Sequence, residues 1–379
     1  MKLPFFENSV RVFFPLAAII AIFVPMWTTG VLNNGYPFEH SFLHVFDWHA
    51  YEMLFGFLLT LATGFILTAA GHWSGKEPLS QLPLVILLAL YLFDKIIIYV
   101  GLPYTLLKVM IFIFPIYFIY QLNNLLADYV QKTKFLTLFI ALLGLKIMFV
   151  FSVLEDFDNS IIKNLTIWTY IYLVYTISSR IVPRFTQNYF QYDPQIMTPI
   201  RVHQISQLTI LFLIFTCFPI LPKWADSILY LLAGVSCLLQ QSFWHPKRSM
   251  SNMLIGMLHV GYALFALGLL FIGISKMLTV FTLFKSDIHL LLTGGISVIG
   301  MNMMLRATLG HTGNPLKYTP FLYSIFICLI IGALLRSFIP ILYPIYAIKS
   351  YHYSMGFWTL GYVFFLIKVI PMVFRSRKS

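Results

Sequence analysis

The sequence predicts an all-α fold: a polytopic transmembrane helix bundle of about twelve helices, with both termini in the cytoplasm. Composition, the spacing of apolar runs and the placement of basic residues predict it. Of 379 residues, 59% are hydrophobic and only 10% are charged, against about 25% charged in ordinary soluble domains. The net charge of +12 does not indicate a nucleic-acid partner, because no nucleic-acid motif occurs and the basic residues gather at the ends of apolar runs. We therefore expect a lipid bilayer as the partner.

Apolar runs long enough to cross a hydrocarbon core of about 30 Å recur between polar breaks. They predict spans near 11–33, 49–71, 82–101, 103–121, 134–153, 161–182, 205–221, 226–243, 252–275, 288–308, 318–339 and 354–373. The first run is too long for a signal peptide and has no cleavage site, so it is counted as a span. We expect one transmembrane domain, 1–379, with possible six-helix halves 1–182 and 205–379. No convincing sequence repeat relates these halves.

Basic residues set the predicted orientation. If the N-terminus is cytoplasmic, most of the 25 lysines and arginines fall on inner ends and loops. This asymmetry is the pattern that membrane insertion produces. The three cysteines, Cys217, Cys237 and Cys328, lie inside apolar runs and form no Cys-x-x-Cys pair, so we expect no disulfide framework.

The second span opens with a group of residues that could bind a ligand. His49, Glu52 and Met53 are spaced i, i+3, i+4 and so share one helical face. Imidazole is the commonest metal ligand in proteins, and a carboxylate one turn away can bind, orient or transfer a proton. We expect His49 to bind a metal or cofactor, with Glu52 as a proton or metal partner. The alternative is an interfacial anchor in which an arginine satisfies Glu52.

The ninth span contains a deeply placed histidine. His259 lies about eight residues from the cytoplasmic end, or roughly 12 Å deep. Small residues around it, including Gly256 and Gly261, leave room for a flat macrocycle. This environment predicts axial haem ligation. Hydrogen bonding between helices is the alternative.

The tenth span carries ionisable groups at both ends. From His289 to Arg306 the helix rises roughly 25 Å, so His289 and the nearby His311 are expected at opposite membrane faces. Because an axial pair must lie at one level and His259 is deeper than His289, we expect one of the four histidines not to bind iron, with His311 the weakest. Arg306 and Arg180 either anchor the interface or hold haem propionates through bidentate contacts.

Several sequence blocks together resemble the NnrS family of bacterial inner-membrane proteins. They are RVFFPLAA, WHAYEMLFGF, GFILTAAGHWSGKEPLS, SSRIVPRFT, MLHVGYALFALGL, IHLLLTGG and MLRATLGHTGNPL. The resemblance implies a haem- and copper-containing protein of about twelve helices, linked to nitric oxide metabolism and to protection from nitrosative stress. Tyr51 stands where the family's motif has a second histidine, so that ligand role is not carried over. His72 stands where asparagine is common and is not expected to be a core ligand.

Taken together, these observations predict a membrane protein that holds haem b, with copper as an open addition, and that binds, senses or detoxifies nitric oxide or derived species. The expected metal ligands are His49, His259 and His289; the cofactor-binding set adds His311, Arg180 and Arg306. The alternative is a secondary transporter or exporter without redox chemistry, which the six-plus-six layout and the intramembrane Glu52, Asp94 and Lys95 favour.

The charge asymmetry leads to a topology prediction. Reporter fusions after residue 78 and at the C-terminus should report cytoplasm, and fusions near residues 39 and 157 should report periplasm. A C-terminus found outside would mean that one predicted span is wrong.

Overall fold

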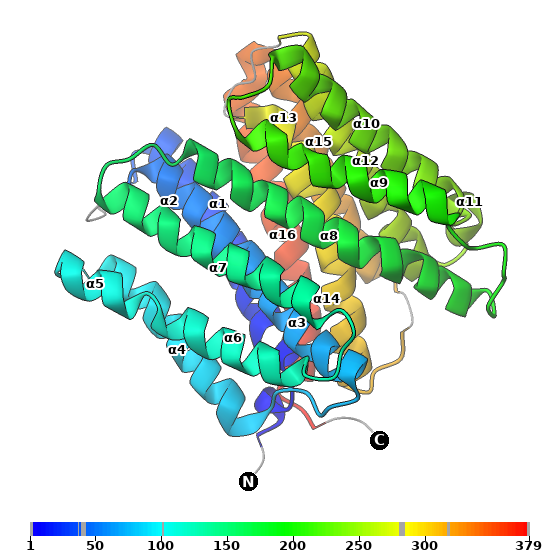
Figure 1. Cartoon of the computed structure of the whole chain (residues 1–379), viewed down its shortest axis with the longest axis horizontal. Coiled ribbons are helices and arrows are strands. Elements are labelled where there is room, and N and C mark those ends of the chain that lie inside the picture. The colour runs from blue at the N-terminus through cyan, green and yellow to red at the C-terminus, as the bar shows by residue number, and fades with distance from the viewer. Residues whose placement is uncertain are drawn as a thin grey trace. The chain divides into compact units, whose positions relative to one another are not determined.

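The computed structural model describes residues 3–36, 38, 43–100, 102–279, 285–316 and 319–376, and over these residues it is all-helical. Ten helical segments of this described part are long and apolar enough to cross a membrane. They are Ser9–Leu32, Val45–Ser74, Gln81–Tyr99, Tyr104–Leu125, Lys132–Leu154, Ile200–Cys217, Met253–Met277, Ser286–His311, Pro320–Leu342 and Pro344–Val373. The predicted all-α membrane fold is therefore confirmed (Figure 1).

Two further predicted spans are helical but are not among these ten segments. The span at 161–182 lies in α8 (Ser160–Tyr189), and the span at 226–243 lies in α10 (Lys223–Ser242). The count of twelve spans and the orientation of the termini stay predictions.

The chain divides into two compact units. The first comprises Met1–Thr169, Met304–Pro315 and Phe365–Ser379. Its elements are η1 (Pro4–Phe6), α1 (Ser9–Asn34), α2 (Val45–Tyr51), the π-helix η2 (Glu52–Leu58), α3 (Leu59–Ser74), α4 (Gln81–Tyr99), α5 (Tyr104–Met110), α6 (Ile113–Leu125) and α7 (Lys132–Leu154), with the start of α8 and the ends of α14 (Ser297–His311) and α16 (Ala347–Val373).

Helix α1 is the centre of the first unit, because α2, η2 and α3 all pack against it. Its N-terminus is capped by the Asn8 side chain, which accepts the backbone N–H of Arg11. The Ser9 hydroxyl donates to the carbonyl of Gly64 at 3.0 Å and bonds the hydroxyl of Thr68 at 2.7 Å. These contacts fix the antiparallel register of α1 and α3.

The second unit comprises Tyr170–Met303 and Leu316–Phe364. Besides most of α8, α14 and α16 it contains α9 (Ile200–Phe212), η3 (Leu213–Cys217), α10, α11 (Pro246–Ser249), α12 (Met253–Met277), α13 (Ser286–His289), the π-helix η5 (Leu290–Ile296), α15 (Pro320–Leu342) and η6 (Pro344–Tyr346). The predicted single domain and its halves 1–182 and 205–379 are contiguous in sequence, whereas these units are not. That predicted organisation stays a prediction.

Helix α12 is the centre of the second unit and packs against α10 and η5. Its glycines lie close to the helix formed by η5 and α14, which runs back along α12. A Cβ on Gly268 would lie 2.6 Å from Cα of Leu291, and one on Gly261 would lie 2.9 Å from the backbone nitrogen of Ile299. Glycine thus permits a backbone approach that larger residues would block, and the two contacts define an antiparallel register.

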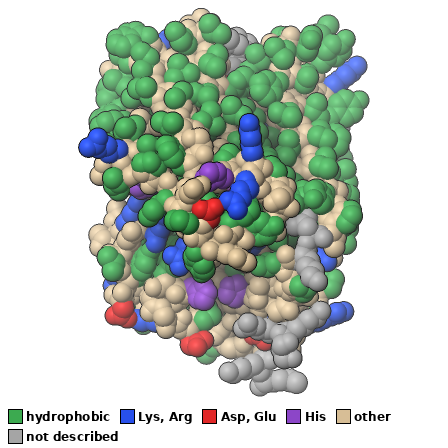
Figure 2. All heavy atoms as spheres, turned by 90° about the vertical axis from the view of Figure 1, so that its right-hand side faces the viewer, with side chains coloured by type: hydrophobic (Ala, Val, Ile, Leu, Met, Phe, Trp, Pro, Cys, Tyr) green, Lys and Arg blue, Asp and Glu red, His purple; other side chains and the backbone are tan. Residues whose placement is uncertain are grey.

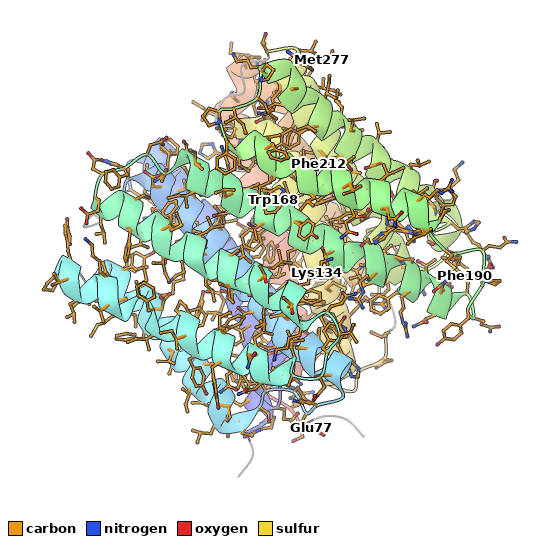
Figure 3. The ribbon with its side chains drawn as sticks, in the orientation of Figure 1. Glu77, Lys134, Trp168, Phe190, Phe212 and Met277 are labelled. Carbon is orange, nitrogen blue, oxygen red and sulfur yellow. The ribbon has the colours of Figure 1, made fainter. Side chains whose placement is uncertain are left out.

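The segment between α8 and α9 is held by an arginine outside the predicted spans. Arg248 pairs with Asp193 at 2.6 Å and its guanidinium lies 4.1 Å from the ring centre of Phe190, just beyond α8 (Figure 3). The backbone N–H of Gln195 and the Arg248 guanidinium hold the pKa of Asp193 below its usual value. The carboxylate is therefore charged at neutral pH.

Large hydrophobic side chains are exposed along the predicted spans of both units. Ile96, Ile116 and Ile140 in the first unit are each more than half exposed, as are Leu232 and Ile327 in the second. Figure 2 shows hydrophobic side chains spread over the face in view. Apolar surface of this extent on helices of spanning length indicates contact with lipid.

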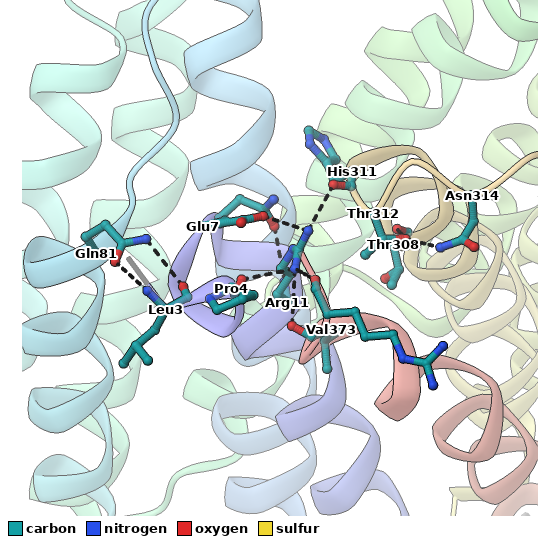
Figure 4. A network of polar contacts seen from close by, with 12 residues as sticks. Leu3, Pro4, Glu7, Arg11, Gln81, Thr308, His311, Thr312, Asn314 and Val373 are labelled. Carbon is teal, nitrogen blue, oxygen red and sulfur yellow. Dashed lines mark hydrogen bonds and ion pairs between the residues drawn. The ribbon is translucent and has the colours of Figure 1, made fainter. Parts of the chain in front are cut away.

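The polar network in Figure 4 is built around one arginine. Arg11 is fully buried. Its guanidinium pairs with Glu7 at 2.7 Å and donates to the carbonyls of Pro4 (3.1 Å), Val373 (3.2 Å), Arg375 (2.6 Å) and His311 (3.4 Å). These acceptors come from all three sequence segments of the first unit. Arg11 therefore connects residues near both termini with the end of α14.

This arrangement predicts that Arg11→Ala destabilises the protein by about 3 kcal/mol or more, because several buried carbonyls lose their donor. Thermal unfolding in mild detergent should show a clearly lower midpoint. Arg201→Ala, at an exposed position on α9, is the matched control and should change the midpoint little. Equal effects of the two substitutions would contradict the role given to Arg11.

Candidate functional site

The predicted site residues are divided between the two units. His49, Glu52, Arg306 and His311 lie in the first unit. Arg180, His259 and His289 lie in the second.

His49 is held by a threonine on the neighbouring helix. Nδ1 of His49 lies 3.0 Å from the hydroxyl oxygen of Thr28 on α1, and that hydroxyl lies 2.8 Å from the carbonyl of Val24. Because the single hydroxyl proton of Thr28 goes to the carbonyl, the ring must donate its Nδ1–H. This tautomer leaves Nε2 with a lone pair, which is the form in which imidazole binds a metal.

Glu52, three residues further on, faces different partners. Lys95 donates to both carboxylate oxygens, at 3.1 and 3.0 Å, and the Tyr99 hydroxyl donates to Oε1 at 3.0 Å. The partner is therefore a lysine with a tyrosine, and the predicted arginine alternative is wrong. The Glu52 carboxylate is thus held by an ammonium group and a hydroxyl group from α4.

A second buried ion pair lies beside the first. Asp94 precedes Lys95 on α4, but it accepts from Lys146 of α7 at 2.5 Å, and both side chains of this pair are at most 2% exposed. The second oxygen of Asp94 and the hydroxyl of the buried Tyr51 have no hydrogen-bond partner among the described residues. Charges this deep are expensive to bury and in membrane proteins they mark ion or proton pathways.

His259 is fully buried in α12 and is bonded on two sides. Its Nε2 lies 3.0 Å from the hydroxyl of Thr186 on α8, whose proton goes to the carbonyl of Val182 at 2.8 Å. The ring therefore donates from Nε2, and Nδ1 carries the lone pair. Within the described part of the chain this nitrogen has no hydrogen-bond partner. A fully buried lone-pair nitrogen costs on the order of 1–3 kcal/mol unless a donor or a metal satisfies it.

A polar network around His259 was not predicted from the sequence. Gln241 donates to the His259 carbonyl at 2.6 Å, and its neighbour Gln240 accepts from the Tyr262 hydroxyl at 3.0 Å and lies 3.0 Å from Nδ1 of His203. The detectable signal was a pair of adjacent glutamines at the end of a predicted membrane span. Buried amides of this kind are retained only when they are bonded.

His289 ends α13 and donates from Nδ1 to the carbonyl of Lys285 at 2.7 Å. A carbonyl only accepts, so Nδ1 carries a proton. In the register of α12 and the returning helix, Gly268 faces Leu291 and Gly261 faces Ile299. His289 is therefore level with residue 270, about 17 Å along α12 from His259. These two histidines cannot ligate one iron from opposite sides.

The remaining residues of the predicted set contribute less to the described geometry. Arg180 is exposed near the middle of α8, and Arg306 is half-buried on α14. His311 is half-buried, and its backbone carbonyl accepts from Arg11. Their predicted cofactor contacts stay predictions. The described residues contain no group of three His, Cys, Asp or Glu side chains placed to hold a metal together.

Comparison with known protein families identifies the family of the chain. The family model described as NnrS protein matches residues 4–377, nearly the whole chain and all of the predicted site residues. The resemblance inferred from the sequence blocks is therefore confirmed. No curated protein matches the chain.

The buried pair of Asp94 and Lys146 leads to a stability prediction. Lys146→Met should destabilise the protein by roughly 3–5 kcal/mol, because it leaves a buried carboxylate without its partner. The double variant Lys146→Met/Asp94→Leu should recover most of the loss. Lys108→Met is the matched control: its pair with Glu155 is exposed and worth about 0–1 kcal/mol. Denaturation in detergent measures all three, and equal losses for Lys146→Met and Lys108→Met would contradict the prediction.

Proposed function

Because the chain belongs to the NnrS protein family, we propose that it is a haem- and copper-binding protein of the bacterial inner membrane. It binds, senses or detoxifies nitric oxide or species derived from it, and so protects against nitrosative stress. The family match carries the proposal, since it spans the chain from the first helix to the last. The chemistry of the histidines supports it.

His259 supports a metal ion at its position. Its buried Nδ1 offers a lone pair, while Thr186 fixes the opposite nitrogen, which is how proteins orient a metal-binding imidazole. Nδ1 adjoins the ring carbon that joins the side chain to the helix, so a wide macrocycle on this nitrogen would collide with α12. A single copper ion, which imidazole suits, meets no such obstacle. We therefore assign copper rather than haem to His259.

His49 and His289 suit haem b better. In each, Nδ1 is the hydrogen-bonded nitrogen, Nε2 is the nitrogen furthest from the main chain, and the side chain is only partly buried. A haem iron held by histidine with an accessible sixth position supplies nitric oxide binding. Arg180 and Arg306 remain the proposed partners of the haem propionates. Glu52, held by Lys95 and Tyr99, remains the proposed proton or metal partner near His49.

A secondary transporter without redox chemistry is the second candidate. The two buried ion pairs favour it, because ion-coupled carriers place such groups within their spans. Nothing in this alternative calls for the lone-pair nitrogens of three histidines. A cofactor spectrum separates the two functions.

The test uses protein purified in mild detergent. Reduced protein should show a Soret band that shifts when nitric oxide is added, and metal analysis should find copper. Folded protein that stays colourless and copper-free after reconstitution would remove the proposal.

Variants of the copper ligand sharpen the test. His259→Ala should remove copper and leave the Soret band. Thr186→Val should weaken copper binding roughly 10–100-fold, because it removes the oxygen that orients the ring. His245→Ala, in the turn before α11, should retain both cofactors. Copper unchanged in His259→Ala would contradict the assignment.

A further inference from the structure

We propose that the chain contains two copies of one helical hairpin, residues 8–75 and 252–313, and that each copy presents its own haem-binding histidine, His49 in the first and His289 in the second. The inference rests on the proposed function. It adds a stoichiometry, because we assign each histidine to a haem of its own.

Both hairpins begin in the same way. Asn8 caps α1 and Asn252 caps α12, and each asparagine side chain accepts the backbone N–H of the residue three positions on, Arg11 and Ile255 respectively. The two capped helices are 26 and 25 residues long. Each is followed by a short connection and a helix that returns antiparallel to it.

Both returning helices open with Asp-x-His and then change to a π-helix. Asp47 and His49 precede η2, and Asp287 and His289 precede η5. Each π-helix is 7 residues long, and the described residues contain no third one. π-Helices are rare and occur frequently at functional sites. η2 begins three residues after His49 and η5 one residue after His289, so each π-helix follows an Asp-x-His sequence closely.

Both returning helices also end in the same way. Gly71 and His72 near the end of α3 correspond to Gly310 and His311 at the end of α14. A left-handed glycine follows in each: Gly75 has φ +69° and Gly313 has φ +70°. Pro-Leu then follows in both, at 78–79 and at 315–316.

In both copies the histidine lies at a similar distance along the first helix, counted from the capping asparagine. His49 bonds Thr28, which lies 20 positions after the capping Asn8. His289 is level with residue 270, which lies 18 positions after the capping Asn252. The difference of two positions is about 3 Å along a helix. This agreement comes from packing and does not use the sequence match.

The two rings are also in the same state. In both, Nδ1 is bonded to an oxygen, the Thr28 hydroxyl at 3.0 Å or the Lys285 carbonyl at 2.7 Å, which leaves Nε2 as the ring nitrogen furthest from the main chain. The copies differ one turn on, where Glu52 of the first corresponds to Leu292 of the second. Only the first site therefore has a carboxylate at this position.

The test measures haem per polypeptide by pyridine haemochrome in full-length protein reconstituted with haem b. His49→Gly and His289→Gly should each retain about half of the wild-type haem, and the double variant almost none. Added imidazole should restore the missing half in each single variant, which also shows that the fold persists. His352→Gly is the matched control: its ring makes the same Nδ1 bond to a carbonyl, at 2.9 Å from Ile348, but lies outside both hairpins.

The outcomes separate this inference from the proposed function. Wild-type protein that takes up no haem would contradict the proposed function. Haem that is lost entirely in one single variant, or unchanged in either of them, would overturn the two-site inference while the function stands. Half-loss in both single variants, with imidazole rescue and an unaffected His352→Gly, supports it.

Discussion

One fully buried guanidinium holds together the three stretches of chain that form the first unit. Arg11 reaches carbonyls beside the N-terminus, at the end of α14 and at the end of α16. Only arginine offers five donors in a fixed planar fork, so lysine could not satisfy as many acceptors from one position. Because Arg11 sits in the first turn of α1, the same contacts orient the helix whose far end carries Thr28, the partner of His49.

The helices follow closely from the sequence, whereas the partners of the buried charges do not. Apolar runs of spanning length are a property of the chain itself, so composition and spacing suffice to locate them. Asp94 and Lys95 are adjacent, but consecutive residues of a helix point about 100° apart. The two side chains therefore pair with residues on different helices. The sequence showed two intramembrane charges on α4, but Lys146 and Glu52 became their partners only through tertiary packing.

The candidate site shows a similar limit at the level of single atoms. The sequence identified His49, His259 and His289, but the state of an imidazole depends on the oxygen that it meets. For His259 that oxygen belongs to Thr186, which is 73 positions away. The hairpin likeness was missed for a related reason. Its matches are a few scattered residues separated by gaps of unequal length, and the caps and π-helices that relate them exist only in the folded backbone.

The pairing of Asp94 with Lys146 has a consequence for biogenesis. The 52 positions between them take roughly 3–10 s to synthesise at about 5–20 residues per second. During that interval α4 exists while its partner on α7 has not yet left the ribosome. Until Lys146 is made, Asp94 therefore has no cation from α7, and its ionised form can enter the lipid in this pairing only after α7 has been synthesised.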